Sequence, residues 1–216
     1  LLVGAGALIA AALIATLAGC GGRTSSGTGA SGTRRCPLTG RPAPAGGAPS
    51  RPALAVKLDN SAPARPQYGL PGADVVYEEP VEGGLTRLIA IFQCQDAPRI
   101  EPIRSGRIVD PQIVEQFGPH PLFAYSGGID AAVSAIRASA VVDVGEARAP
   151  AGTYRRDAGR QAPHNLYSST SALYAAGRAV DAPADAPPPV FEFGPRPAGS
   201  TGTSAVHIAF SASPVT

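Results

Sequence analysis

Several residue types are scarce or missing in this chain of 216 residues. It contains no methionine, no tryptophan and a single lysine, Lys57, so arginine supplies almost all of its positive charge. The formal net charge is only +2, which gives no electrostatic argument for a nucleic-acid partner. The apolar fraction of 44% is nevertheless ample for a packed core, and this excludes a chain that is disordered throughout.

The sequence also lacks the short motifs of well-known active sites. It has no GxSxG nucleophile elbow and no GxxxxGK phosphate loop, and the glycine-rich stretch "SGTGASG" follows no predicted strand. Its cysteines form no CxxC pair and no closely spaced Cys/His set, so a zinc site is not expected. The sequence therefore indicates neither a metal nor a cofactor.

The first 20 residues, "LLVGAGALIAAALIATLAGC", form an uncharged apolar run that ends in small residues. This pattern is typical of an export signal, although about 20 apolar residues would also suffice for an anchor helix. The ending Leu17-Ala18-Gly19-Cys20 matches a bacterial lipobox, in which the cysteine is acylated and becomes the first mature residue. We therefore predict a signal peptide at 1–19, lipidation at Cys20 and anchoring to the outer face of the cytoplasmic membrane.

The segment at 20–35, "CGGRTSSGTGASGTRR", contains Gly, Ser and Thr without apolar periodicity and is predicted to be a flexible tether. Beyond it, Cys36 and Cys94 form an even pair in a compartment outside the reducing cytosol. We expect a Cys36–Cys94 disulfide, with two unpaired thiols as the alternative. The chain has no initiator methionine and stops soon after a strand-like "VHIAF", so we expect it to be incomplete at both ends.

Strand and helix patterns alternate without a regular βαβ rhythm, which favours an α+β or irregular α/β domain. We expect a mixed sheet with a central β-hairpin, short helices and long loops rich in proline and glycine. Strands are predicted at 53–59, 74–81, 85–93, 121–126 and 140–145, with a further short one within the proline-rich 181–202. Helices are predicted at 111–117, at 129–139, where Ile129, Val133 and Ile136 have the spacing of an apolar stripe, and at 169–180, which has a Ser or Thr start. The stretch 154–169 is predicted to be a polar loop.

The stretch "ADVVYEEPVEGGLTR", residues 73–87, concentrates glutamates at a predicted hairpin. Along one extended strand, Glu78 and Glu82 lie roughly 13 Å apart, whereas paired glycosidase carboxylates need about 5 to 9.5 Å. A two-residue turn at Gly83-Gly84 would pair Pro80 with Arg87 and place Arg87 between the two glutamates. The arithmetic therefore predicts a charged clamp, since an opposite charge lowers a carboxylate pKa and discourages proton transfer.

Among the three histidines, His164 is the strongest candidate for a functional role, because it stands beside Asn165 in a loop rich in arginine. It could act as a general base, or it could cap a helix or bridge backbone groups. Polar residues from several loops could converge with it on one groove. These candidates for a polar ligand site are Asn60, Arg65, Gln67, Glu78, Glu82, Arg87, Arg104, Arg107, His164 and Asn165.

A set of longer segments resembles one known family. The stretches "PLTGRPAP", "RPALAVKLDNSAPARPQYGLPGADVVYEEPVEGGLTRLIAIFQ", "IRSGR", "FAYSGG" and "RQAPHNLY", in this order, are similar to the YerB-like family of bacterial lipoproteins, a domain of unknown function. The resemblance implies an exported, membrane-anchored protein with no assigned activity. It also implies a large N-terminal domain, at 36–198 here, and the start of a smaller C-terminal domain at 199–216.

Three functional hypotheses remain open at this point. The first is a lipid-anchored binding or accessory module of the cell envelope, with a glycan, a peptide or a protein as its ligand. The second is an envelope hydrolase or transferase in which His164 acts with Glu78 or Glu82. The third is a polar network that only braces the loops and has no ligand.

Overall fold

The computed structural model describes residues 35–208 and 210, and the signal peptide, Cys20 and the tether lie outside these residues. Among the described residues, no helix is long and apolar enough to cross a membrane. The elements, in chain order, are β1 (Leu54–Asp59), η1 (Ala62–Ala64), η2 (Leu70–Gly72), β2 (Val75–Pro80), η3 (Glu82–Gly84), β3 (Thr86–Phe92), α1 (Asp110–Val114), η4 (Glu115–Phe117), β4 (Leu122–Ala124), α2 (Asp130–Ala138), β5 (Val142–Asp143), β6 (Arg155–Arg156), β7 (Leu166–Tyr167) and α3 (Thr170–Ala179).

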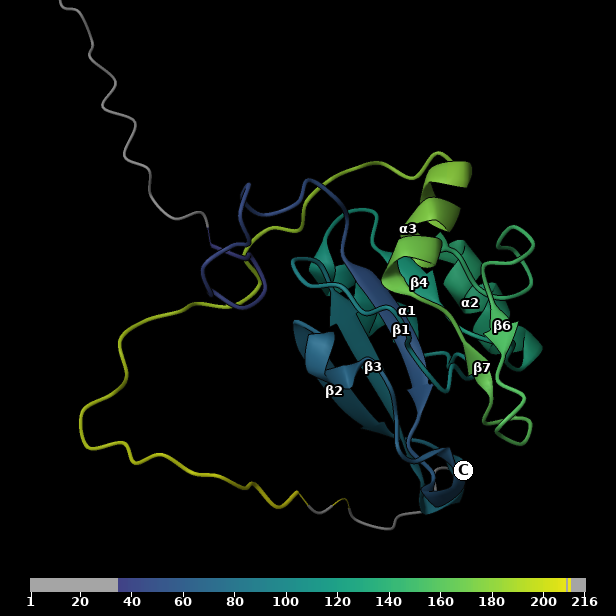
Figure 1. Ribbon diagram of the computed structural model, residues 1–216, viewed down its shortest axis with the longest axis horizontal. Coiled ribbons are helices and arrows are strands. Elements are labelled where there is room, and N and C mark those ends of the chain that lie inside the picture. The colour runs from purple at the N-terminus through teal and green to yellow at the C-terminus, as the bar shows by residue number, and fades with distance from the viewer. Residues whose placement is uncertain (1–34, 209, 211–216) are drawn as a thin grey trace, which may run out of the picture. The chain divides into compact units, whose positions relative to one another are not determined.

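A mixed sheet of five strands, in the order β2-β3-β1-β4-β5, organises the domain (Figure 1). β1 pairs antiparallel with β3 and parallel with β4, and the hairpin β2–β3 forms one side of the sheet. The predicted α+β class with short helices is therefore confirmed. Because β1 has neighbours on both sides and is covered on both faces, all six of its residues are buried.

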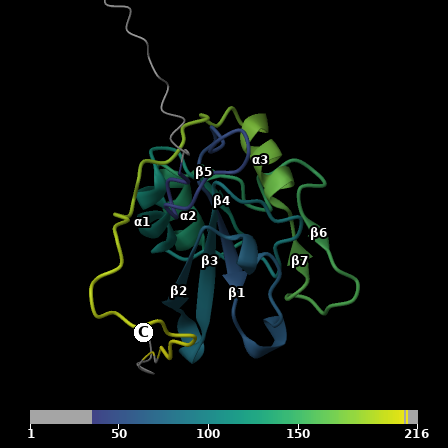
Figure 2. The ribbon, with the colours of Figure 1, turned by 60° about the vertical axis from the view of Figure 1, so that its left-hand side comes forward.

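The sheet separates two hydrophobic clusters. Leu54, Val56 and Leu58 pack on one face with Leu173 of α3, whereas Ala55 packs on the other face with α1, η4 and α2. Figure 2 shows α1 and α2 on one side of the sheet and α3 on the other. Side chains in β1 alternate between the faces, so Lys57 and Asp59 point to the same side as Ala55 and α1.

The two longer helices, α2 and α3, can be compared with their sequence patterns. The predicted Ser or Thr start of α3 is confirmed, because the Ser169 hydroxyl accepts a hydrogen bond from the Ala172 N–H at 3.1 Å. In α2 the expected apolar stripe is only partly buried. Ile136 is fully buried, but Ile129 precedes the helix and 62% of its surface is exposed.

Two predictions about the second half of the chain are wrong. The stretch 154–169 is not only a loop, because Arg155–Arg156 and Leu166–Tyr167 pair as the two-stranded sheet β6–β7. No strand forms at 181–202, where the prolines lack the N–H donors that a ladder requires. Residues 206–208 are also outside any strand, and part of the expected "VHIAFS" strand lies outside the described residues.

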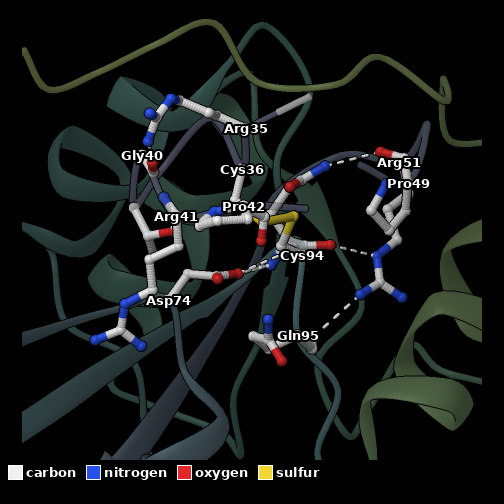
Figure 3. The surroundings of a disulfide bond; sticks show 12 residues. Arg35, Cys36, Gly40, Arg41, Pro42, Pro49, Arg51, Asp74, Cys94 and Gln95 are labelled. Atoms are coloured by element: carbon white, nitrogen blue, oxygen red, sulfur yellow. Dashed lines mark hydrogen bonds between the residues drawn. A yellow bond between two sulfur atoms is a disulfide. The ribbon is translucent and has the colours of Figure 1, made fainter. Parts of the chain in front are cut away.

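The structure contains a Cys36–Cys94 disulfide with a Cα–Cα distance of 5.8 Å (Figure 3). It joins the loop before β1 to the residues that follow β3, across 58 positions of sequence. Asp74 stabilises the same region, because its carboxylate accepts hydrogen bonds from the N–H groups of Gln93 and Cys94 at 2.5 and 2.8 Å. Arg51 Nε adds a bond to the Gln93 carbonyl at 2.6 Å.

Replacing both cysteines, as Cys36→Ala with Cys94→Ala, should lower the free energy of unfolding by about 2 to 4 kcal/mol, since the unfolded chain loses a long covalent loop. Urea denaturation under oxidising conditions measures this loss. A reductant should destabilise the wild-type protein to a similar extent and leave the double variant unchanged. Equal stability of the two proteins without reductant would contradict a stabilising role for the bond.

Candidate functional site

Polar side chains gather where β1 ends. Asp59 is the last residue of this central strand and Asn60 follows it, while the tip of the β2–β3 hairpin and the loops at 61–69, 101–107 and 157–165 all contribute partners. Such convergence follows from topology, because chain segments that leave and enter adjacent strands meet at one edge of a sheet.

The base of the cluster is the only lysine in the chain. Lys57 is fully buried, and its ammonium donates to the Asp110 carboxylate at 2.7 Å and also to Glu79 Oε1. Asp110 is fully buried as well, and its second oxygen accepts the Arg107 N–H at 2.7 Å. Burial raises the pKa of Glu79; the Lys57 ammonium opposes this shift and the Asp110 carboxylate adds to it.

This network was not predicted from the sequence. Only the pairing of the strands and the packing of α1 bring its residues together. Lys57, Glu79 and Asp110 come from β1, β2 and α1, so no local motif unites them. One signal was nevertheless present in the sequence. Lys57 stands within an otherwise apolar strand pattern, "ALAVKL", and a lysine at such a position needs a buried counter-charge.

The predicted hairpin register is wrong by one residue. β2 pairs Glu79 with Arg87 and Pro80 with Thr86, and the chain turns through Val81–Leu85 instead of through a two-residue loop. Gly83 and Gly84 adopt positive φ values of 72° and 71° within a 3-10 turn, which glycine accepts readily. The shift moves Glu79, and not Glu78, to the face that packs on α1.

The charged clamp expected around Arg87 is therefore not present. Glu78 accepts hydrogen bonds from Asn60 Nδ2 at 3.0 Å and from Thr86 Oγ1 at 2.7 Å. Glu82 instead forms an ion pair with Arg107 at 2.7 Å, and Arg87 donates to the Ser105 carbonyl at 2.8 Å. The two glutamates thus belong to different contacts, each with a partner from another loop.

Asn60 connects the hairpin to the loop that follows β1. Its amide nitrogen donates to Glu78 and to Thr86, at 3.0 and 2.7 Å. Its amide oxygen accepts bonds from Gln67 Nε2 at 2.8 Å and from Arg65 Nη2 at 3.2 Å. Four of the predicted ligand-site residues, Asn60, Arg65, Gln67 and Glu78, are therefore brought together by one side chain.

Asp59 holds the other half of the cluster. Its Oδ2 accepts Arg104 Nε at 2.9 Å and lies 2.9 Å from His164 Nδ1, and its Oδ1 accepts the Ser61 N–H. Burial by itself would raise the pKa of Asp59, but the hydrogen bonds from Ser61, the Arg104 charge and the His164 hydrogen bond outweigh it and lower the pKa. The carboxylate therefore stays ionised at neutral pH and orients the imidazole of His164.

An open pocket of about 500 Å³ lies beside His164. Its wall includes Arg65, Tyr68, Arg160 and His164, from the loops at 63–68 and 157–164. The guanidinium of Arg160 donates to the carbonyls of Ala64 and Pro66, which fastens the two loops to each other. We call this cavity the His164 pocket.

The remaining predicted residues lie apart from the His164 pocket. Arg107 and Glu82 line a different cavity, and the amide oxygen of Asn165 accepts a bond from Arg156 at 3.1 Å. A group of residues around Arg99, which was not predicted from the sequence, supports the wall of the His164 pocket. Arg99 pairs with the carboxylates of Glu101 and Asp157, and its guanidinium stacks on the ring of Tyr68 at 4.7 Å.

The described residues contain no group of three or more His, Cys, Asp or Glu side chains arranged to hold a metal ion. The site is instead a set of arginines, carboxylates and amides around one oriented imidazole. A mixed sheet with helices on both faces and polar loops at the end of its central strand defines a disulfide-bonded α+β domain.

The chain belongs to the family described as "Protein of unknown function (DUF3048) N-terminal domain", which matches residues 38–182. Within this family, it is 44% identical over 73 residues to a Bacillus subtilis (strain 168) protein named "Putative lipoprotein YerB". The predicted relationship to the YerB-like family is thereby confirmed.

The crystal structure of the YerB protein from Bacillus subtilis is similar to the present fold, with a TM-score of 0.66 and 28% sequence identity. That match covers 72% of this chain and 53% of the solved chain, and the curated match covers 34% of this chain and 22% of the Bacillus protein. The chain thus aligns with only part of the length of these relatives.

Replacing the buried lysine, as Lys57→Met, should destabilise the domain by about 3 to 5 kcal/mol at neutral pH, because two buried carboxylates lose their counter-charge. The loss should shrink as the pH falls, since Glu79, whose pKa is raised by burial, can then take up a proton. Urea denaturation of the variant and the wild type at several pH values measures both effects.

The triple variant Lys57→Met, Glu79→Gln, Asp110→Asn provides the control, because it removes the buried charges together. It should be more stable than Lys57→Met alone. A loss below about 1 kcal/mol in the single variant, the range of exposed ion pairs, would contradict a structural role for the network.

Proposed function

We propose that this protein is a lipid-anchored, extracytoplasmic cell-envelope protein whose domain at 36–198 binds an anionic group in the His164 pocket. The ligand would be a carboxylate or phosphate carried by an envelope glycan or peptide. The lipobox ending at Cys20 and the name of the Bacillus relative support the anchor. The arginines in the wall of the His164 pocket support the binding role.

The positive charges of this wall are only partly neutralised at close range. Arg65 and Arg160 direct their described hydrogen bonds to backbone carbonyls and to an amide oxygen, and neither bonds a carboxylate within the described part of the chain. The carboxylate nearest to Arg160 belongs to Glu101, at 3.9 Å. The acidic residue in the lining, Asp157, is paired with Arg99. An anion would therefore find the guanidinium of Arg65, which has no ion pair in the described part of the chain, beside that of Arg160, whose ion pair with Glu101 is long.

The environment of the polar residues argues against a network that only braces the loops. Such a network would bury Glu78 and Asn60 and would leave no cavity beside them. Glu78 is exposed and Asn60 is half-buried, and Arg65, which binds Asn60, also lines the His164 pocket. A solvent-exposed polar cluster beside a cavity is more typical of a ligand-binding site than of a network that stabilises a core.

One contact favours catalysis as the second candidate function. His164 lies against the ionised Asp59 at the edge of the pocket, and a carboxylate that orients an imidazole is the arrangement of a general base. In this proposal Asp59 replaces Glu78 and Glu82, which form their described bonds with Asn60, Thr86 and Arg107 instead. The reaction would be a hydrolysis or group transfer on an envelope substrate.

Arg65→Gln should weaken retention of the anionic ligand by about tenfold or more, because a charge-assisted hydrogen bond contributes roughly 1.5 to 3 kcal/mol. The measurement incubates the protein with fractionated envelope glycans and peptides and quantifies both bound and released material. Arg155→Gln is the matched control, since Arg155 is exposed in β6 and lies outside the pocket lining. Equal retention by all three proteins would contradict the proposed binding site.

The same incubation separates binding from catalysis through His164→Gln. Loss of a released product with ligand retention preserved would support the general-base role. Retention without any product from the wild-type protein would reject the enzyme and leave the binding module.

Cys20→Ser should abolish acylation and move the protein from the membrane fraction to the soluble exported fraction, because the thiol is the atom that carries the lipid. Fractionation of bacterial cells and mass spectrometry of the N-terminal peptide check this outcome. Membrane retention of the variant in unchanged amount would contradict anchoring through Cys20 and favour an uncleaved anchor helix.

A further inference from the structure

A second pocket lies between the hairpin tip and the loop before α1. It has a volume of about 240 Å³ and shares no lining residue with the His164 pocket. Val81, Ile108, Val109 and Ile129 supply apolar walls, with Ile108 and Val109 about half exposed at 50% and 48%. Exposed apolar side chains around a cavity are typical of a site that binds an apolar group.

Glu79 is an acidic residue in this apolar lining. Its side chain is only 9% exposed, and Oε1 already accepts the Lys57 ammonium. Its other oxygen, Oε2, is buried and has no hydrogen-bond partner among the residues that the structure describes. A buried carboxylate oxygen without a donor is costly, so a donor from a bound molecule would stabilise it.

The charges around Glu79 are unbalanced. One ammonium, from Lys57, contacts two carboxylates, those of Glu79 and Asp110. Arg107 also lines the pocket, but its guanidinium is bound to Glu82 and to the Gly106 carbonyl. Burial raises the pKa of Glu79, which agrees with a carboxylate that has too little positive charge nearby. Arg87 lies opposite Glu79 in the β2–β3 ladder, but its guanidinium donates to the Ser105 carbonyl. One additional monovalent cation would therefore balance the charges of Lys57, Glu79 and Asp110.

We propose that this pocket binds a primary ammonium group on an aliphatic stem, with the ammonium donating to Glu79 Oε2. The methylene groups would lie against Val81, Ile108, Val109 and Ile129, and the ammonium would reach Glu79, the buried acidic residue of the lining. The ammonium of a small alkylamine and that of a lysine side chain in a peptide share this chemistry. The inference does not depend on the anion-binding role of the His164 pocket.

The test is a titration of the isotope-labelled full-length protein with n-butylammonium chloride, followed by NMR. Saturable shifts of the amide signals of Glu79, Val109 and Ile129 are expected, and n-butanol, which has the same stem without the charge, should produce at least tenfold weaker binding. Nα-acetyl-lysine methylamide is the second arm. If it saturates the same signals, a peptide side chain fits the pocket, and if it does not, only small amines do.

Two variants examine the base and the mouth of the pocket separately. Glu79→Gln should weaken n-butylammonium binding at least tenfold, and its amide spectrum checks that the fold survives the loss of a Lys57 partner. Val109→Trp avoids that difficulty, because Val109 is 48% exposed and a large side chain there should obstruct the mouth. Val76→Trp is its control, since Val76 is 44% exposed and outside the lining.

Three outcomes would overturn the proposal. They are equal affinity for n-butanol and n-butylammonium, unchanged binding by Val109→Trp, and the absence of saturable shifts at millimolar amine. Failure here would leave the His164 pocket untouched, because Arg65→Gln is tested with anionic ligands and Val109→Trp with amines.

Discussion

The buried ion pairs of Lys57 connect the parts of this domain that carry its polar residues. The ammonium joins β1 to Glu79 of β2 and to Asp110 of α1, so the central strand, the edge strand and the first helix share one set of contacts. Moving three charged groups out of water is costly, and only their mutual attraction and further hydrogen bonds offset that cost. The relative placement of the hairpin and α1 is therefore tightly specified at this point.

The two pockets follow from that placement. The hairpin tip and the loop before α1 enclose the apolar pocket, while Asp59 and Asn60 organise the loops around the His164 pocket. The lining of the first pocket combines apolar walls with a buried carboxylate, and the lining of the second combines guanidinium groups with an imidazole. Neighbouring regions of one small domain thus offer opposite chemistry to a ligand.

Local patterns were sufficient for most of the fold. The apolar "ALAVKL" run predicted β1, the Gly-Gly pair predicted a hairpin, and the Ser169 start predicted α3. The same reasoning was wrong about the register of the hairpin, because Gly83 and Gly84 lie in a wider turn than the two-residue one expected. It also missed β6–β7, whose two-residue strands are too short to show a period.

The sequence by itself determined the family, most of the element types and which residues carry charge, since these depend on composition and on patterns within a few residues. Only the tertiary structure decided which of two adjacent glutamates is buried, because side chains alternate along a strand and a shift of one residue exchanges its faces. It also decided the partner of His164, since Asp59 lies 105 positions away along the chain. Contacts at that separation depend on how the strands and loops pack together, which no local pattern encodes.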